Sequence, residues 1–234
     1  MKILAIETSS SVCSVAILED EALIKEITIE DENTHSVKLM PIIENIFKDT
    51  NLKLEDIELF CCDKGPGSFT GIRIGVATIK AFIDVVNKEG IGISSLEALV
   101  YNVKEEGFIC SLIDAKNSNV YAGVFKHIGG EYIQTNELIA DNINNILDLV
   151  KNNGENIIFI GDGAINYKDK IIEKFGSNAI IKDNKLNAKN IGLAAFYKYK
   201  LNNTNEKNSL SPLYLKKSSA EIMLEEKKNG TKDL

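Results

Sequence analysis

The sequence predicts a mixed α/β protein built from two similar halves, and two observations support this fold class. Each half of the 234-residue chain opens with strand-like segments joined by short polar turns, and then alternates between helical and strand-like patterns. A single doubly wound sheet would lack these leading antiparallel strands, so two mixed sheets covered by helices fit the order better. The composition, with 44% hydrophobic and 26% charged residues, is typical of a globular protein.

The first half contains two long predicted helices between apolar strands. Thr34 is a favourable N-cap residue for the first helix, in which Pro41 predicts a kink or a late start, and Ser95 is expected to cap the last helix. The predicted elements, in chain order, are strands at residues 3–7, 12–18 and 22–29, a helix at 34–49, a strand at 57–63, a glycine-rich turn at 65–71, a helix at 72–87, a strand at 91–94 and a helix at 95–103.

The second half repeats this order with a different ending. Its predicted elements are strands at residues 108–113, 120–128 and 132–139, a helix at 142–151, a strand at 157–160, a helix at 165–175, a short strand at 179–181 and a helix at 186–200. The repetition predicts an N-terminal lobe over residues 1–104 and a C-terminal lobe with a tail over residues 105–234. The lysines and acids of residues 216–234 predict a solvated end.

The charge balance and the hydropathy exclude several classes of function. With 27 basic and 34 acidic residues the net charge is −7, so the chain lacks the positive surface that tight, unaided binding of nucleic acid requires. No run of 18 apolar residues occurs, and Glu7 interrupts the N-terminal apolar segment too early for a signal peptide. We therefore expect a cytoplasmic protein without a membrane span. The four cysteines show no CxxC spacing and are expected to be reduced and buried.

Two predicted helices carry more apolar surface than one sheet can cover. In the helix at 37–49, apolar residues form a continuous arc of about 160°. In the helix at 71–86, only Arg73, Lys80 and Asp84 form a polar stripe. The surplus apolar surface is expected either to lie in the core or to dock another protein chain.

A glycine-rich loop precedes the second of these helices and reads Gly65-Pro66-Gly67-Ser68-Phe69-Thr70-Gly71. The position between a strand and a helix suits anion binding by backbone N–H groups, but the spacing matches neither the P-loop nor the dinucleotide fingerprint. Gly67, Gly71 and Gly75 recur every four residues and leave one ridge without side chains, where another backbone can approach. The preferred interpretation is a tight turn with a close helix contact.

Two predicted turns occupy corresponding places in the two halves, at residues 8–11 and 114–119. Together with Gly161-Asp162-Gly163 they would suit a nucleotide between the lobes, although Ser, Asn and Asp are also the ordinary residues of hairpin turns. The residues of this vestigial nucleotide site would be Thr8, Ser9, Asp114, Gly161 and Gly163.

Catalytic and metal-binding patterns are scarce. The two histidines, His35 and His127, form no HxxxH or HExxH pair, and no G-x-S-x-G elbow occurs. The sequence therefore predicts no metal site and no catalytic residue.

Several segments together resemble a known family. They are residues 3–8, 34–36, 65–75, 113–115, 120–121 and 212–216. On these segments, which extend over nearly the whole chain, the sequence resembles the bacterial TsaB (YeaZ) family, and residues 65–75 are the most specific part. The resemblance implies the two-lobe fold shared by actin-like, sugar-kinase and heat-shock-protein ATPases.

The resemblance also implies a function without catalysis. In that family TsaB is the partner of a paralogue, TsaD, which transfers a threonylcarbamoyl group to the adenosine at position 37 of tRNAs that read ANN codons. An ATPase, TsaE, joins the assembly. The resemblance implies that this chain activates TsaD, that it meets tRNA only through TsaD, and that it forms a homodimer when alone. No cofactor is required, and ATP or ADP would bind at the interface of the complex.

The residue types carried over from the family form two sets. The partner-binding helices would supply Val37, Met40, Ile43, Phe47, Ile72, Val76, Ile79 and Ile83, without a division between partner-facing and core-facing members. The motif loop comprises Gly65, Pro66, Gly67, Ser68, Phe69, Thr70, Gly71 and Arg73.

Two departures from the family pattern concern nucleotide chemistry: Glu7 stands where the first strand often ends in Asp, and Asp63-Lys64 precedes the loop. The metal-binding histidine pair of TsaD has no counterpart here, which favours a scaffold over an enzyme. The alternative is a small ATP-dependent, kinase-like enzyme of the same superfold that uses Glu7 and Asp114. Its expected Asp-x-Gly is missing, because Asp114-Ala115-Lys116 stands in its place.

Arg73 is the only arginine among the 27 basic residues, and it lies in the most specific motif. A lysine cannot reproduce the planar fork of donors that a guanidinium presents. We therefore expect Arg73 to make multidentate contacts, either bracing the glycine loop or crossing to the partner, with the intrachain role preferred.

Overall fold

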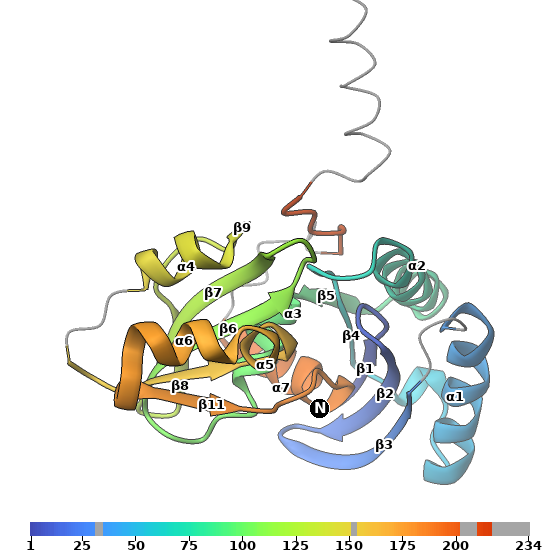
Figure 1. Ribbon diagram of the computed structural model, residues 1–234. Helices are drawn as coiled ribbons and strands as arrows, with labels where there is room; N and C mark the ends of the chain where they lie inside the picture. Colours follow the sequence, from blue (N-terminus) through green and yellow to red (C-terminus); the bar gives the residue numbers. More distant parts are fainter. Residues whose placement is uncertain (31–34, 151–153, 202–209, 217–234) are drawn as a thin grey trace, which may run out of the picture.

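The computed structural model describes residues 1–30, 35–150, 154–201 and 210–216, and it arranges them in two lobes, each built on one mixed sheet (Figure 1). The first sheet has the strand order β3-β2-β1-β4-β5, and the second has the order β11-β10-β6-β7-β8, with β9 paired to β7. When the second sheet is read from β8, its order repeats that of the first. The predicted duplication of a mixed α/β unit is therefore confirmed.

The first lobe follows the predicted order with small changes at the helix ends. Its elements are β1 (Lys2–Glu7), β2 (Val12–Glu19), β3 (Ala22–Glu30), α1 (His35–Thr50), a 3₁₀ turn (Leu54–Asp56), β4 (Leu59–Asp63), α2 (Phe69–Val86), β5 (Glu89–Ile93) and α3 (Ser95–Val100). Helix α2 begins three residues earlier than predicted, because Ser68 Oγ caps it by accepting the Gly71 N–H at 3.3 Å.

One predicted cap in this lobe was wrong, one of the two alternatives for Pro41 is excluded, and one predicted cap lies outside the described residues. Ser94, not Ser95, caps α3, since Ser94 Oγ accepts the Leu96 N–H. Pro41 lies inside α1, which starts at His35, so the helix has no late start. Thr34 is outside the described residues.

In the second lobe, two predicted elements are each divided in two. The elements are β6 (Gly107–Asp114), β7 (Asn119–Ile128), β8 (Glu131–Gln134), β9 (Ile139–Asn142), α4 (Ile143–Leu149), β10 (Ile157–Ile160), α5 (Asp162–Asn166), α6 (Lys168–Phe175), a 3₁₀ turn (Gly176–Asn178), β11 (Ala179–Lys182) and α7 (Ala188–Lys200). Asn136 interrupts the strand predicted at 132–139 by accepting the Val124 N–H through its side chain. The helix predicted at 165–175 breaks at Tyr167.

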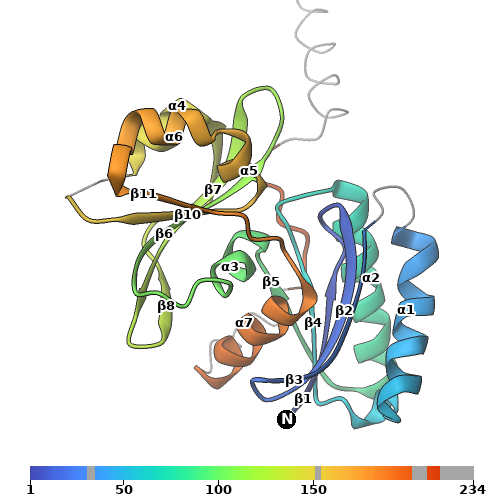
Figure 2. The ribbon, with the colours of Figure 1, turned by 60° about the horizontal axis from the view of Figure 1, so that its bottom comes forward.

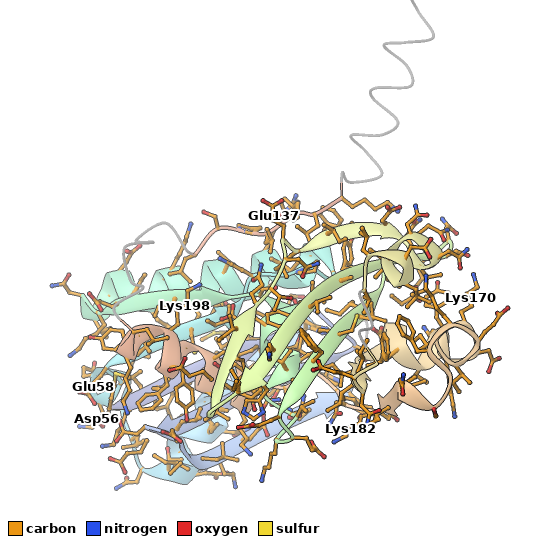
Figure 3. The ribbon with its side chains drawn as sticks, turned by 90° about the vertical axis from the view of Figure 1, so that its left-hand side faces the viewer. Asp56, Glu58, Glu137, Lys170, Lys182 and Lys198 are labelled. Carbon is orange, nitrogen blue, oxygen red and sulfur yellow. The ribbon has the colours of Figure 1, made fainter. Side chains whose placement is uncertain are left out.

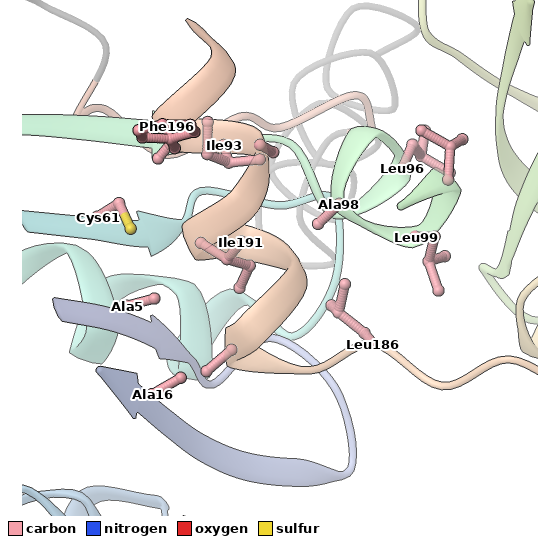
Figure 4. Packing of buried hydrophobic residues seen from close by; sticks show 14 of the residues in the cluster. Ala5, Ala16, Cys61, Ile93, Leu96, Ala98, Leu99, Leu186, Ile191 and Phe196 are labelled. Atoms are coloured by element: carbon pink, nitrogen blue, oxygen red, sulfur yellow. The ribbon is translucent and has the colours of Figure 1, made fainter. Parts of the chain in front are cut away.

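Helix α7 follows the second lobe in sequence but packs on the first sheet. Figure 4 shows Ile191 and Phe196 of α7 over Ala5, Ala16 and Cys61, and all five belong to one buried cluster. Figure 2 shows α7 on the face of this sheet opposite α1 and α2. The first sheet is therefore covered on both faces, and residues beyond position 104 supply one of its layers.

The start of α7 is held by polar groups of the first sheet. Ser14 Oγ accepts the Ala188 N–H at 3.2 Å, and Glu26 Oε1 accepts the Lys189 N–H at 2.9 Å. An acidic group at a helix N-terminus is favourable because it faces the positive end of the helix dipole. These bonds fix the return of the chain to the first lobe.

The surface and the cysteines agree with the composition. Figure 3 shows labelled charged side chains, among them Lys170 and Lys182, at the periphery of the molecule. The Lys182–Glu105 pair at 2.6 Å is partly exposed, and such pairs contribute little to stability. All four cysteines are unpaired and buried, as predicted. Within the described residues, no helix is long and apolar enough to span a membrane.

Ser111→Ala is expected to raise the free energy of unfolding by about 1 kcal/mol, because the Ser111 hydroxyl is fully buried and has no hydrogen-bond partner among the described residues. The matched control is Ser14→Ala. Ser14 is equally buried, but its hydroxyl bonds to Glu26, Thr28 and the Ala188 amide, so its removal should lower stability. Urea unfolding measures both. If both variants changed the free energy of unfolding in the same direction, the prediction would be contradicted.

Candidate functional site

The glycine-rich loop lies directly against the turn between β1 and β2. A Cβ atom on Gly71 would overlap the Thr8 carbonyl oxygen, and one on Gly67 would lie 2.5 Å from the Ser9 carbonyl oxygen. A Cβ on Gly75 would lie 2.7 Å from Thr8 Oγ1. The predicted close approach of a second backbone to this ridge is confirmed, and that backbone belongs to the same chain.

Hydrogen bonds fix the loop in this position. The Ser68 N–H donates to the Ser9 carbonyl at 2.7 Å, and Thr8 Oγ1 donates to the Gly71 carbonyl at 2.8 Å. The Gly71 N–H is also engaged, since it donates to Ser68 Oγ. Two of the amides that an anion would need therefore already have partners. The geometry favours the interpretation as a turn with a close helix contact.

Two carboxyl groups are buried behind this loop. Glu7 and Asp63 end the neighbouring parallel strands β1 and β4, and they are 0% and 1% exposed. Glu7 Oε1 accepts the N–H groups of Ser9 and Ser10 at 2.7 and 2.9 Å. Asp63 Oδ1 accepts the Gly65 N–H at 2.5 Å. Burial raises the pKa of both carboxyls above their ordinary values.

A cavity of about 570 Å³ separates the lobes, and residues from both lobes line it. The first lobe supplies the β1–β2 turn and the glycine loop, and the second lobe supplies the β6–β7 turn and the start of α5. Ser9, Asp114 and Gly161 of the proposed nucleotide site are among the lining residues. Thr8 is instead buried beneath the turn, where it contacts α2.

Asp114 is held by groups of its own lobe. Its carboxylate accepts bonds from the Lys116 N–H at 3.0 Å, from Tyr167 Oη at 3.2 Å and from Asn166 Nδ2 at 3.2 Å. Lys116 Nζ also lies 3.3 Å from Asp114 Oδ2. Burial raises the pKa of Asp114, but the bonds from Lys116 and Tyr167 outweigh burial, so the pKa lies below its usual range.

The β6–β7 turn adopts a left-handed backbone without glycine. Lys116, Asn117 and Ser118 have φ values of 62°, 53° and 60°. Lys116 occupies the position at which the kinase-like alternative requires the glycine of Asp-x-Gly. Lys116 thus adopts a left-handed backbone, which glycine favours, and its side chain pairs with Asp114.

The glycines of α5 serve close packing within the lobe. A Cβ on Gly161 would overlap the Leu112 carbonyl oxygen, and one on Gly163 would lie 3.0 Å from the Leu112 carbonyl carbon. Asp162 Oδ1 accepts the Asp114 N–H at 3.0 Å and so joins α5 to the β6–β7 turn. This packing explains both glycines without a base or ribose in the cavity.

The eight residues proposed for partner binding divide into three groups by exposure. Ile43, Ile72, Val76 and Ile79 are buried in the core of the first lobe, so they are not available to a partner. Phe47 and Ile83 are half-buried. Val37 and Met40 are exposed, by 70% and 52%. The periodicity identified the apolar arcs but did not separate the core face from the outer face.

Sequence reasoning also missed an exposed member of this surface. Val85, near the end of α2, is 77% exposed, and the outer face of α2 also exposes Ala77 and Ala81 beside the charged Lys80 and Asp84. A helical-wheel projection of α2 separates its buried arc from its charged stripe. The apolar residues outside both, which include Val85, could have been identified in this way as a separate surface.

Met40 of α1 and Val85 of α2 lie on neighbouring helices, which Figure 1 shows side by side. Asp49 of α1 pairs with Lys25 of β3 at 3.3 Å, and Met40 lies about 180° from Asp49 around the helix, on the side of α2. Ile83 of α2 faces Gly90 of β5, and Val85 lies on the opposite side of α2. We call Val37, Met40, Ile74, Ala77, Ala81 and Val85 the docking face.

Arg73 makes the preferred intrachain contact, and among the described residues its partner is Tyr214 rather than several acceptors. Its exposed guanidinium donates a hydrogen bond from Nε to Tyr214 Oη at 2.8 Å, and its Cζ lies 5.6 Å from the centre of the Tyr214 ring. The Tyr214 ring stacks on Phe69 with a centroid separation of 4.8 Å, and the Leu213 N–H donates to the Lys64 carbonyl. Arg73 therefore anchors residues near the C-terminal end onto the motif loop, a contact across 141 positions that local sequence patterns do not reveal.

Arg73→Lys is expected to lower the free energy of unfolding by about 0.5–1 kcal/mol, because an exposed hydrogen bond of good geometry is lost. Tyr214→Phe removes the same bond from the other side and serves as the control. Thermal or urea unfolding of both single variants and of the double variant gives the coupling. Fully additive losses would show that the bond contributes nothing.

The comparisons with known proteins agree with this geometry. A family model described as TsaD, tRNA N6-adenosine threonylcarbamoyltransferase, matches residues 23–224. The tRNA threonylcarbamoyladenosine biosynthesis protein TsaB of Bacillus subtilis (strain 168) is 30% identical over 188 residues, which are 77% of this chain and 80% of that protein. A tRNA N6-adenosine threonylcarbamoyltransferase of Brachyspira hyodysenteriae is 32% identical over 104 residues, or 38% of this chain and 31% of that protein.

A solved structure confirms the fold class. YeaZ from Pseudomonas aeruginosa superposes with a TM-score of 0.78 at 20% identity, covering 92% of this chain and 99% of that chain. The two duplicated lobes of this chain therefore have the same fold as that protein. With the family match over most of its length and its TsaB relative, the chain belongs to the TsaB (YeaZ) family of tRNA threonylcarbamoyladenosine biosynthesis proteins.

Proposed function

We propose that this chain is a non-catalytic subunit of threonylcarbamoyladenosine formation, which binds the transferase TsaD through the docking face and activates it. The observation that carries the proposal is the apolar surface of α1 and α2, where Val37, Met40 and Val85 are more than half exposed. Apolar side chains grouped on one face of adjacent helices are typical of protein interfaces. Membership of the TsaB family supports a role in the same pathway.

The likeness of this chain to TsaD supports TsaD as the partner. The TsaD model matches residues 23–224, which include both docking helices. Related chains share helices of the same kind in the same place, so they can pair with one another in the way that a homodimer pairs, with one paralogue in place of the second copy. Homodimerisation through the docking face would then be a resting form, because one surface cannot bind both partners at once.

The environment of the acidic groups supports a role without chemistry. Glu7 is fully buried and its carboxyl is surrounded by Ser9 and Ser10, while Asp114 is held by Lys116, Asn166 and Tyr167. The carboxyl groups of both residues are therefore already hydrogen-bonded to groups of the same chain. With a net charge of −7, the chain would leave most contacts to tRNA to TsaD, and the ATPase TsaE would join the assembly in the cytoplasm.

The cavity between the lobes is the observation that favours the alternative function, a kinase-like enzyme that binds ATP. Its volume of about 570 Å³ and the hydroxyl-rich turn Ser9–Ser11 suit a nucleotide in size. The proposal expects no robust ATP hydrolysis by the isolated chain, with ATP or ADP bound at most at the interface with TsaD.

The test combines the purified chain with TsaD, TsaE, tRNA, threonine, bicarbonate, ATP and the enzyme that makes the threonylcarbamoyl adenylate. We expect a stable complex with TsaD, and modified adenosine only when this chain is present. Robust ATP turnover by the isolated chain, or full modification without it, would overturn the proposal. The variants that locate the interface follow in the Discussion.

A further inference from the structure

The guanidinium of Arg73 is held in place by a residue near the C-terminal end of the chain. Its Nε donates to Tyr214 Oη at 2.8 Å, and its Cζ lies 5.6 Å from the centre of the Tyr214 ring. At this distance a cation is attracted to the face of an aromatic ring. Two contacts with one side chain therefore orient the guanidinium before any partner binds.

Tyr214 is itself fixed to the first lobe. Its ring stacks on Phe69 with an interplanar angle of 18°. The adjacent Leu213 N–H donates to the Lys64 carbonyl at 2.7 Å. Leu210 is 6% exposed and packs into the core of the same lobe. The support for the guanidinium is therefore anchored to the start of the glycine loop and to the core.

Most of the donors of this guanidinium are not used within the chain. The contact with Tyr214 uses the Nε hydrogen, which is one of the five N–H donors of an arginine. Among the residues that the structure describes, the two Nη groups have no hydrogen-bond partner. The edge between these two groups is the tip of the side chain, and Arg73 is exposed. Two parallel N–H groups on an exposed edge match the two oxygens of a carboxylate.

Arg73 lies at the border of the docking face. It precedes Ala77 of that face by four residues, so the two lie about 40° apart around α2. Lys80 and Asp84 continue the same charged stripe, and all three charged residues are exposed. An apolar centre with a charged border is the usual arrangement of a protein interface. Because the stripe carries two positive groups and one negative group, the surface that it faces in a complex is expected to be acidic.

We propose that Arg73 binds a carboxylate of TsaD through its two Nη groups, while its Nε stays bonded to Tyr214. This contact rests on the proposed function, because it assigns the chemistry of the partner at the border of the docking face. A side chain that is already oriented loses less entropy on binding, and two parallel charge-assisted bonds are stronger than one neutral bond. The sole arginine among 27 basic residues then has a role that a lysine ammonium cannot fill.

Calorimetric titration of this chain with intact TsaD from the same organism, in the absence of tRNA and nucleotide, gives the test. We expect Arg73→Gln to weaken binding about tenfold or more, and Arg73→Lys to weaken it about fivefold, because lysine keeps the charge but loses the fork. Without tRNA and nucleotide no phosphate group competes for the guanidinium. A loss of affinity then reports a group of TsaD.

Tyr214→Phe separates binding from support within the chain. It breaks the same intrachain bond as Arg73→Gln but keeps both the ring and the guanidinium. The two variants should therefore lose similar stability, whereas Tyr214→Phe should keep its affinity for TsaD within about twofold. Lys168→Gln changes the net charge as Arg73→Gln does, but at an exposed site of α6 in the second lobe, and should bind TsaD as the wild type does.

Double-mutant cycles then identify the carboxylate. Each Asp and Glu on the docking helices of TsaD is replaced by Asn or Gln, and each TsaD variant is titrated with the wild-type chain and with Arg73→Gln. For the acid that Arg73 binds, the replacement should weaken binding to the wild type but have little further effect on Arg73→Gln.

The binding of the wild-type chain distinguishes the possible failures. If the wild type does not bind TsaD, the proposed function and the carboxylate contact are both wrong. If the wild type binds TsaD but Arg73→Gln loses no more affinity than Tyr214→Phe, docking on TsaD stands and the carboxylate contact is wrong. Cycles that show no coupling between Arg73 and any acid of TsaD would also overturn the contact.

Discussion

Gly71→Ala is expected to destabilise the protein by about 3 kcal/mol and to lower its Tm by roughly 6–12 °C. Within a helix this substitution ordinarily stabilises by about 1 kcal/mol, because alanine is the better helix former. Here the new methyl group would overlap the Thr8 carbonyl oxygen. That oxygen belongs to the backbone, so no rotamer change can relieve the overlap, and α2 must move away from the β1–β2 turn.

The neighbouring Thr70→Ala provides the control for Gly71→Ala. Thr70 lies in the same turn of α2 but is exposed, so its substitution should change stability by less than about 0.5 kcal/mol. Unfolding by heat and by urea measures both variants. A Gly71→Ala protein as stable as wild type would show that the turn and the helix are not locked together in solution.

The close contact at Gly71 also shows how far sequence reasoning reaches. The four-residue spacing of Gly67, Gly71 and Gly75 predicted that a backbone would approach this ridge, because the absence of side chains has few other uses. It did not identify this backbone as residues 8 and 9 of the same chain. Which segment approaches the glycines depends on the order of strands in the sheet, and local sequence patterns do not determine that order.

The strands were predicted more reliably than the ends and positions of the helices. The apolar residues of β2 and β7 form runs bounded by polar turns, so the predicted boundaries of these strands shifted by no more than one residue. The start of α2 was missed because Ser68, which caps the helix, was assigned to a turn. The packing of α7 on the first sheet joins residues such as Gly192 and Leu18, whose contact no local signal predicts.

The candidate site follows the same division. Glu7 and Asp63 were seen separately as departures from the family pattern, but their contact arises only because β1 and β4 are parallel neighbours. The apolar arcs of α1 and α2 were correct as arcs. Without knowing the direction of the sheet, the sequence could not show that Ile79 lies in the core while Val85 lies on the surface.

Met40→Glu and Val85→Lys are each expected to weaken binding of TsaD by at least about 30-fold without changing the fold. Truncation or charging of an anchor at the centre of an interface costs about 2 kcal/mol or more, because the charge is buried without a partner. Both side chains are more than half exposed in the free chain, so the substitutions leave its core intact. Glutamate early in α1 and lysine late in α2 also suit the helix dipoles.

Leu149→Lys is the matched control for Val85→Lys. Leu149 ends α4 as Val85 nearly ends α2, and it is exposed to a similar degree, but it lies on the second lobe. The control should bind TsaD as the wild type does, whereas a charge at Ile79 would unfold the first lobe and report nothing about an interface. Calorimetric affinities and modification of tRNA in the reconstituted system should fall together for the two docking variants. If neither Met40→Glu nor Val85→Lys changed the affinity, TsaD would bind elsewhere on the chain. An apolar interface over the docking face would bury at least one of these two charges without a partner.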